Sequence, residues 1–342
     1  MNNYSDGFRL KIRQVAKVLA DATTIWLFPH EDPDGDAFGS TIAMLLALRA
    51  MRKKARAFTY NDIPRMYRKL PGLDDLDVNA TLPDEMPDVV LVLDNAEWER
   101  VGDSYREQLA AMGIEPHAGC SRPMILNVDH HISNTQFGDI NLVCTDCAAT
   151  GILVYDLLLE LGVALTPDII TNIYVALITD TGRFSFRNTD RRAFEVAGEL
   201  TALGVEPAKI IQDVYYTRSP QQMRLFGLIF GTLTEVPDLG AVYAWQTKQM
   251  LEETITRASD TEGAIDLMRT IGDYPLSLFF KENHKGVKVS IRSKSNFNAA
   301  TFALRFAGGG HAGAAGFTVY DTMENAIRIV LDTLGESLAK TA

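Results

Sequence analysis

Residues 24–51 read TIWLFPHEDPDGDAFGSTIAMLLALRAM. The first five residues of this stretch predict a strand, and its last twelve predict a helix. Between these two segments, His30, Asp34 and Asp36 place one imidazole and two carboxylates within seven residues. Ligands of open α/β sheets bind at the carboxyl ends of strands, and carboxylates mixed with imidazole suit Mn²⁺ or a similar divalent ion. The stretch therefore predicts an α/β fold with a metal-binding loop.

Three further clusters of acidic residues and histidines follow apolar runs. They are Asp94 after 89–93, Asp129, His130 and His131 after 124–128, and Asp180 after 168–179. Each cluster alone is explained equally well by a turn or a helix cap. Because parallel strands end at one edge of a sheet, we expect the clusters to converge there. The carboxylates of Asp34, Asp36, Asp94 and Asp180 would then repel one another, and two divalent ions would balance their four negative charges.

Strand-like and helix-like segments alternate over the first 200 residues, which predicts a doubly wound α/β domain with a mostly parallel sheet. The expected strands are 25–28, 54–60, 89–93 and 124–128, and the expected helices are 8–21, 41–51, 150–161 and 168–179. A smaller α/β domain follows, with strands at 241–246, 276–282, 286–292 and 315–319 and helices at 262–271, 297–306 and 324–338. We place the first domain, which carries these clusters, at 1–215, a linker at 216–238 and the second domain at 239–342.

Composition excludes several classes of function. A net charge of −11 argues against a duplex-DNA binder, which needs a basic face. No apolar run of 18 residues and no leader-like segment occurs, so we expect a cytoplasmic protein that spans no membrane. The cysteines are Cys120, Cys144 and Cys147, and no second C-x-x-C pair could complete a zinc knuckle, so we expect inert thiols.

Four stretches resemble the motifs of the DHH phosphoesterase superfamily, in the same order. They are HEDPDGDAFGS (30–40), VLVLDNAEWERVG (90–102), LNVDHHISNTQFG (126–138) and ALITDTGRFSF (176–186). Arg292, Ser293 and the stretch GGGHAGAAG (308–316) resemble the DHH-associated substrate-binding domain. The resemblance covers nearly the whole chain and is strongest to the nano-RNase and 3′-phosphoadenosine-5′-phosphate phosphatase type.

The resemblance implies a site for two divalent ions, with Mn²⁺ as the expected metal. His30 and Asp34 would hold one ion, Asp36, His130 and Asp180 would hold the other, and Asp94 would bridge them. His131 would position the scissile phosphate or its leaving group. Asp129 would orient an imidazole or a backbone group from behind the ligands. Both of these residues are thus candidate members of the catalytic machinery.

The glycine-rich end is ambiguous from the residues alone. It predicts either a flexible loop or a backbone nest for an anion. The resemblance implies that residues 1–215 form the catalytic domain and that the active-site cleft lies between the two domains. It also implies that the nucleotide end away from the metals is bound by Arg292, Ser293, Gly308, Gly309, Gly310 and His311.

The implied activity is hydrolysis of short oligoribonucleotides and linear dinucleotides to 5′-mononucleotides, with 3′-phosphoadenosine 5′-phosphate as a further substrate. The direction of exonuclease attack and a homodimer are left open. The alternatives are an inorganic pyrophosphatase or polyphosphatase, and a nucleotide-binding sensor without activity. Three features depart from the family pattern. Asp32 and Ile152 stand where relatives often carry a neutral polar residue and an acid, and the segment 100–123 is longer.

Overall fold

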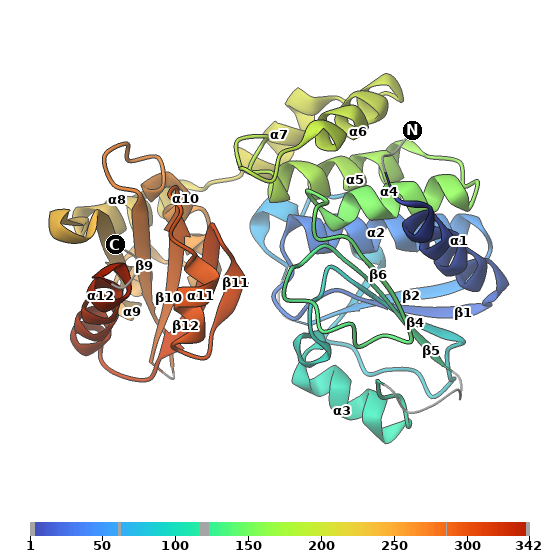
Figure 1. Cartoon of the computed structure of the whole chain (residues 1–342), viewed down its shortest axis with the longest axis horizontal. Coiled ribbons are helices and arrows are strands. Elements are labelled where there is room, and N and C mark those ends of the chain that lie inside the picture. The colour runs from blue at the N-terminus through green and yellow to red at the C-terminus, as the bar shows by residue number, and fades with distance from the viewer. Residues whose placement is uncertain (1–3, 61–62, 117–122, 285, 340–342) are drawn as a thin grey trace. The chain divides into compact units, whose positions relative to one another are not determined.

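The computed structural model describes residues 4–60, 63–116, 123–284 and 286–339 (Figure 1). The chain divides into two compact units, Met1–Thr217 and Arg218–Ala342. Cys120 and residues 117–122 of the expected surface loop lie outside the described residues.

The first unit contains a six-stranded sheet in the order β3-β2-β1-β4-β5-β6. Its strands are β1 (Thr24–Phe28), β2 (Lys54–Thr59), β3 (Leu76–Val78), β4 (Val89–Leu93), β5 (Met124–Asp129) and β6 (Ile140–Val143). The recorded pairings within this sheet are all parallel. This is the strand order of doubly wound sheets, whose switch point lies between the first and fourth strands. The predicted sheet is therefore confirmed. The edge strands β3 and β6 were not predicted, because they are short and lack an apolar run.

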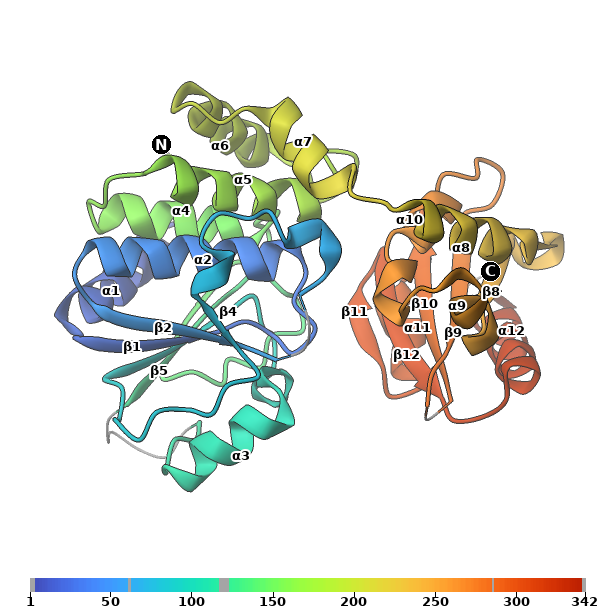
Figure 2. The ribbon, with the colours of Figure 1, turned by 180° about the vertical axis from the view of Figure 1, so that it is seen from behind.

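Helices lie on both faces of this sheet (Figures 1 and 2). One face carries α1 (Asp6–Asp21), α2 (Gly35–Ala50), α4 (Thr150–Glu160) and α5 (Pro167–Asp180), with α6 (Arg191–Ala202) and α7 (Pro207–Tyr215) packed beyond α5, while α3 (Asp103–Ala111) lies on the other face. In β1, Ile25 and Leu27 join the larger core, whereas Trp26 and Phe28 join the core beneath α3. Because strand side chains alternate between faces, a continuous apolar run fits a strand that is buried on both sides.

Helices α2 and α5 pack so closely that only glycine fits between them. A Cβ on Gly39 would lie 2.4 Å from the carbonyl oxygen of Asn172, and one on Gly35 would lie 2.3 Å from the side chain of Thr179. The N-terminus of α2 therefore meets the C-terminus of α5, where Asp180 lies. Helix α2 begins earlier than predicted, because Asp34 caps it by accepting hydrogen bonds from the next turn.

The second unit is a smaller α/β body whose sheet has the order β11-β12-β10-β9-β8-β7. Its strands are β7 (Thr234–Val236), β8 (Ala241–Gln246), β9 (Leu276–Glu282), β10 (Val287–Ser293), β11 (Gly309–His311) and β12 (Ala314–Val319). The β8–β9 pairing is parallel, and the other recorded pairings are antiparallel. Helices α8 (Pro220–Gly231), α9 (Lys248–Thr254) and α10 (Ala264–Met268) cover one face, and α11 (Ala299–Leu304) and α12 (Met323–Ala339) cover the other.

Short 3₁₀ segments complete the described elements. They are η1 (Arg65–Tyr67), η2 (Leu73–Asp75), η3 (Trp98–Val101), η4 (Pro237–Leu239) and η5 (Ala258–Thr261).

Two parts of the second unit differ from the sequence interpretation. The expected linker, 216–238, contains α8 and β7, whose contacts belong to the second unit: Leu225 and Phe226 are buried beside Phe279, and β7 pairs with β8. The linker was placed too broadly because the helix looked polar along much of its length. The expected glycine loop at 308–311 contains the edge strand β11, paired with β12.

Candidate metal centre

The predicted clusters converge at one edge of the first sheet. His30 follows β1, Asp94 follows β4, and Asp129 ends β5. Asp36 lies in the first turn of α2, and Asp180 is the last residue of α5. The eight residues singled out in this unit are thus carried by the ends of three neighbouring strands and two touching helices.

One group of possible ligands surrounds His130. Its Nε2 lies 3.8 Å from Asp36 Oδ2, 3.6 Å from Asp94 Oδ1 and 3.4 Å from Asp180 Oδ2. Two atoms that each lie about 2.1 Å from one ion are separated by about 3 to 4 Å. Ligand atoms of Asp36, Asp94 and His130 also lie within 4.8 Å of one another, so these three side chains are spaced as ligands of one cation would be, and Asp180 adds a carboxylate beside His130.

A second group contains His30, Asp34 and Asp94, whose ligand atoms lie within 4.8 Å of one another. His30 Nε2 is 3.9 Å from Asp94 Oδ2. Asp94 belongs to both groups, with Oδ1 nearer His130 and Oδ2 nearer His30. This is the arrangement expected of a carboxylate that bridges two ions.

The N-terminus of helix α4 holds two of these carboxylates. The backbone N–H groups of Thr150 and Gly151 donate to the two oxygens of Asp36, at 2.6 and 2.9 Å. The hydroxyl of Thr150 donates to Asp94 Oδ1 at 2.9 Å. Sequence reasoning placed a helix start at Thr150 but missed this role, although helix N-termini favour anions.

The charges of the first group are not balanced by protein alone. Burial and the neighbouring Asp94 and Asp180 raise the pKa of Asp36 well above its usual range. Burial also raises the pKa of Asp94 to about 7. Burial lowers the pKa of His130, but Asp180, Asp94 and Asp36 outweigh it and raise that pKa to about 10. Repelling carboxylates around one imidazole are the donor set that a divalent cation would neutralise, so the residues fit a metal.

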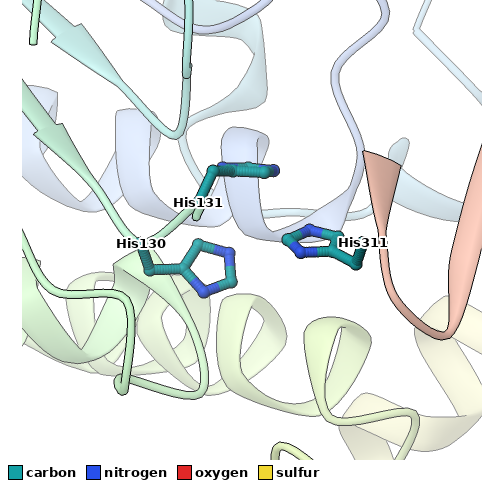
Figure 3. Close-up of side chains that lie close together, drawn as sticks. All are labelled: His130, His131 and His311. Atoms are coloured by element: carbon teal, nitrogen blue, oxygen red, sulfur yellow. The ribbon is translucent and has the colours of Figure 1, made fainter. Parts of the chain in front are cut away.

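The imidazole rings of His130 and His131 lie close together (Figure 3), and different contacts hold the two rings. His130 Nδ1 lies 3.1 Å from the carbonyl oxygen of Cys147, which can only accept, so Nδ1 donates and Nε2 faces the carboxylates. His131 Nδ1 lies 2.6 Å from Asp129 Oδ1. Asn134 donates to the other oxygen of Asp129 at 2.6 Å, which fixes that buried carboxylate.

The contact between Asp129 and His131 shifts the pKa values of the two side chains in opposite directions. Burial raises the pKa of Asp129, but His131 outweighs it and brings the pKa down to about 2. Burial lowers the pKa of His131, but Asp129 outweighs it and the pKa rises overall. Asp129 is thus a buried carboxylate paired with the imidazole of His131.

Sequence reasoning also missed Arg100 of η3. Its Nη2 lies 3.3 Å from His30 Nδ1, and its carbonyl oxygen accepts from the N–H of Glu31 at 2.6 Å. Burial, followed by Arg100, lowers the pKa of His30 to about 4. The residue belongs to the stretch VLVLDNAEWERVG, so position within a motif was the available signal.

In the second unit, β12 lies between the predicted substrate residues. Ala314 pairs with Arg292 on one side and with His311 on the other. Paired residues share a face, so Arg292 and His311 lie on one face about 10 Å apart, two strand spacings. Ser293 is buried on the other face, and its hydroxyl contacts Ser295.

The three glycines have distinct surroundings. A Cβ on Gly308 would lie 2.3 Å from the carbonyl oxygen of Gly316, and Gly310 has a φ of +136°. Gly309 has open space around it. Two of the three glycines are therefore required by packing against β12, and Gly309 is the one that leaves room for a ligand.

The two residues that depart from the family pattern differ in their burial. Asp32 is exposed, whereas Ile152 is fully buried in the core of the first unit. The apolar side chain at 152 is therefore explained by packing.

Family comparisons match both units. The DHH family, N-terminal domain, matches residues 24–178, and the DHHA1 domain matches residues 243–340. The bifunctional oligoribonuclease and PAP phosphatase NrnA of Thermus thermophilus is 35% identical over 96% of this chain and 95% of the relative. The Bacillus subtilis protein of the same name is 28% identical over 93% of this chain and 95% of the relative.

Solved structures share the fold. An exopolyphosphatase-related protein from Bacteroides fragilis is 25% identical, with a TM-score of 0.85 and 96% coverage of both chains. RecJ from Thermus thermophilus in complex with Mn²⁺ has a TM-score of 0.52 at 14% identity and matches this chain over 96% of its length and 55% of RecJ. None of the helices in the described ranges has the length and hydropathy that a membrane span requires.

Proposed function

Since the chain belongs to the DHH family, we propose that it is a metal-dependent phosphoesterase that hydrolyses short oligoribonucleotides and 3′-phosphoadenosine 5′-phosphate. The name of the Thermus relative, which aligns with almost the full length of both chains, supports these substrates. The observation that carries the proposal is Asp94, whose two oxygens lie in two separate ligand groups.

The donor set supports two divalent ions, and Mn²⁺ suits it. His30 and Asp34 would hold one ion, Asp36, His130 and Asp180 would hold the other, and Asp94 would contact both. Oxygen and imidazole ligands are preferred by Mn²⁺ over soft thiolate sites. When bound, such ions lower the pKa of a water and neutralise charge on the phosphate.

The protein groups then have separate tasks. Thr150 and Gly151 hold Asp36 in place, which orients its carboxylate. Asp129 fixes the ring of His131 through Nδ1, and the protonated ring would donate from Nε2 to the scissile phosphate or its leaving oxygen. The raised pKa of His131 favours the protonated ring that this task needs.

In the second unit, we assign binding of the terminal nucleotide to Arg292 and His311. They lie on one face of the sheet, and Gly309 leaves open space beside them. A guanidinium fork and an imidazole are both suited to phosphate. Gly308 and Gly310 pack closely against β12, and Ser293 is buried at the end of β10. These residues would therefore support the positions of His311 and Arg292.

The proposal is tested with a substrate panel. Purified protein is incubated with Mn²⁺ and diadenylate, pentaadenylate, 3′-phosphoadenosine 5′-phosphate, pyrophosphate or polyphosphate, and products are separated by ion-exchange chromatography. We expect AMP from the first three substrates and little turnover of the last two. Faster turnover of pyrophosphate or polyphosphate would overturn the assignment in favour of the alternative phosphatase. A pentamer labelled at one end reports the direction of attack.

A further inference from the structure

Arg292 has a carboxylate partner within its own unit. Its Nε donates to Asp266 Oδ1 at 3.0 Å, and Asp266 lies on helix α10. The side chain of Arg292 is 23% exposed and that of Asp266 is 43% exposed. An ion pair this open contributes little to folding stability, so stability alone does not account for it.

The pair fixes which atoms of Arg292 can meet a ligand. Arg292 lies in β10 on the face opposite Val289 and Ile291, which point into the core beneath α11 and α12. Asp266 engages Nε from helix α10, whose Ala264 and Met268 are buried. Nη1 also donates to the carbonyl oxygen of Ile291 at 3.4 Å, so a phosphate would bind through the remaining N–H groups of the two Nη nitrogens.

We propose that Asp266 is a positioning residue, which holds the guanidinium of Arg292 so that its Nη edge meets the phosphate of a bound nucleotide. The proposal rests on the substrate-binding role of Arg292 given under the proposed function. A pre-oriented fork loses less side-chain entropy when it binds than a mobile one does. Asp266 thus improves binding although its own charge repels an anion.

The charge of Asp266 and its positioning of Arg292 have opposite effects on nucleotide affinity, so the direction of the change in affinity distinguishes them. If Asp266 acts only through its charge, removing it leaves a more positive site, and nucleotide binding becomes tighter. If it positions Arg292, removing it weakens binding. Arg269 follows α10. Burial lowers the pKa of Arg269 most, Asp266 raises it and Arg292 lowers it further, so Arg269 is electrostatically coupled to this pair. If Asp266 acts only through its charge, its removal leaves the charges of both Arg292 and Arg269 unbalanced. The tighter phosphate binding expected from a charge-only role would then be easy to detect.

The experiment compares Asp266→Ala and Asp266→Glu with wild type in the full-length, Mn²⁺-loaded protein. For diadenylate we expect KM to rise about three- to tenfold in Asp266→Ala, the effect of one lost hydrogen bond, with kcat unchanged. Asp266→Glu should recover most of the loss. The matched control is Glu336→Ala, which breaks the Arg305–Glu336 pair on α12, on the other face of the same sheet. An unchanged or lower KM in Asp266→Ala would overturn the proposal.

A binding measurement separates this inference from the proposed activity. Calorimetric titration of AMP into metal-free protein reports the nucleotide site without hydrolysis. Weaker binding in both Arg292→Ala and Asp266→Ala, and not in Glu336→Ala, supports positioning even if the substrate panel fails. If Arg292→Ala leaves AMP affinity unchanged, Asp266 has no ligand group to position and the inference is wrong.

Discussion

The hydroxyl of Thr150 donates a hydrogen bond of 2.9 Å to Oδ1 of Asp94, which links the start of helix α4 to the end of strand β4. The backbone N–H of the same threonine donates to Asp36. One residue therefore orients two carboxylates that belong to different parts of the chain.

Thr150→Val tests this link, because valine keeps the shape and the backbone N–H but removes the hydroxyl. We expect the Mn²⁺ concentration for half-maximal activity to rise about 10- to 100-fold, as is typical when a group that supports a ligand is lost. Metal titration of activity gives the value. Thr201→Val on α6, whose hydroxyl donates only to the local carbonyl of Ala197, is the matched control. An unchanged midpoint would show that Thr150 does not orient Asp94.

Asp94→Asn should abolish hydrolysis while the protein stays folded. Asp94 has a φ of +54°, a conformation that asparagine adopts more readily than alanine does. Asparagine lacks the charge that two ions would share, so we expect less than about a tenth of the wild-type rate at saturating Mn²⁺.

The thermal stability of the Asp94→Asn variant is measured in the metal-free protein at pH 8. Burial raises the pKa of Asp94 in the folded protein to about 7, above the pKa of this group in the unfolded chain. Ionisation of Asp94 therefore destabilises the folded protein, and the loss is complete once the pH has risen through about 7. We therefore expect a melting temperature at least as high as that of wild type. A rate above about a tenth of wild type would contradict the bridging assignment.

Much of this fold could be predicted because its signals are local. Val89–Leu93 is an unbroken apolar run and was placed to the residue. The clusters that meet at the sheet edge could be predicted because each cluster follows an apolar run. Strand β11 was missed because its glycines are required by close packing against its partner strand β12, which the local sequence does not show. Thr150 and Arg100 were missed for a similar reason, since their importance lies in contacts with residues about 56 and 70 positions away.

The double substitution of Cys144 and Cys147 by serine should leave hydrolysis and metal content unchanged. Cys147 meets the site through its carbonyl oxygen, which accepts from His130, and serine retains that oxygen. Its thiol lies 3.4 Å from the hydroxyl of Tyr4, which also donates to Asp156. Metal analysis and activity with and without dithiothreitol check this expectation. Zinc that disappears with the thiols, or activity that follows the reductant, would show that they are not inert.

Arg292→Ala should separate long substrates from small ones. Loss of a charge-assisted contact to phosphate lowers kcat/KM for diadenylate about ten- to a hundredfold. Bis(p-nitrophenyl) phosphate carries no terminal phosphate for Arg292 to bind, so its turnover should hardly change. Metal content should stay constant. Equal losses on both substrates would mean that Arg292 supports the fold or the metals.

Gly39→Ala should destabilise the first unit more than an ordinary helix substitution does. Its Cβ would lie 2.4 Å from the carbonyl oxygen of Asn172 and 2.9 Å from the backbone nitrogen of Ala176, so α2 and α5 must move apart. Overpacking of this kind costs about 1 to 3 kcal/mol, more than the gain of about 1 kcal/mol that alanine brings to a helix interior.

Gly227→Ala on α8 is the matched control, because a Cβ there meets open space and only the helix gain remains. Urea unfolding measures both variants. Because the same packing places Asp36 near Asp180, Gly39→Ala should also raise the Mn²⁺ requirement, whereas Gly227→Ala should not. Equal stability changes of the same sign in the two variants would show that the α2–α5 contact is not as tight as the structure has it.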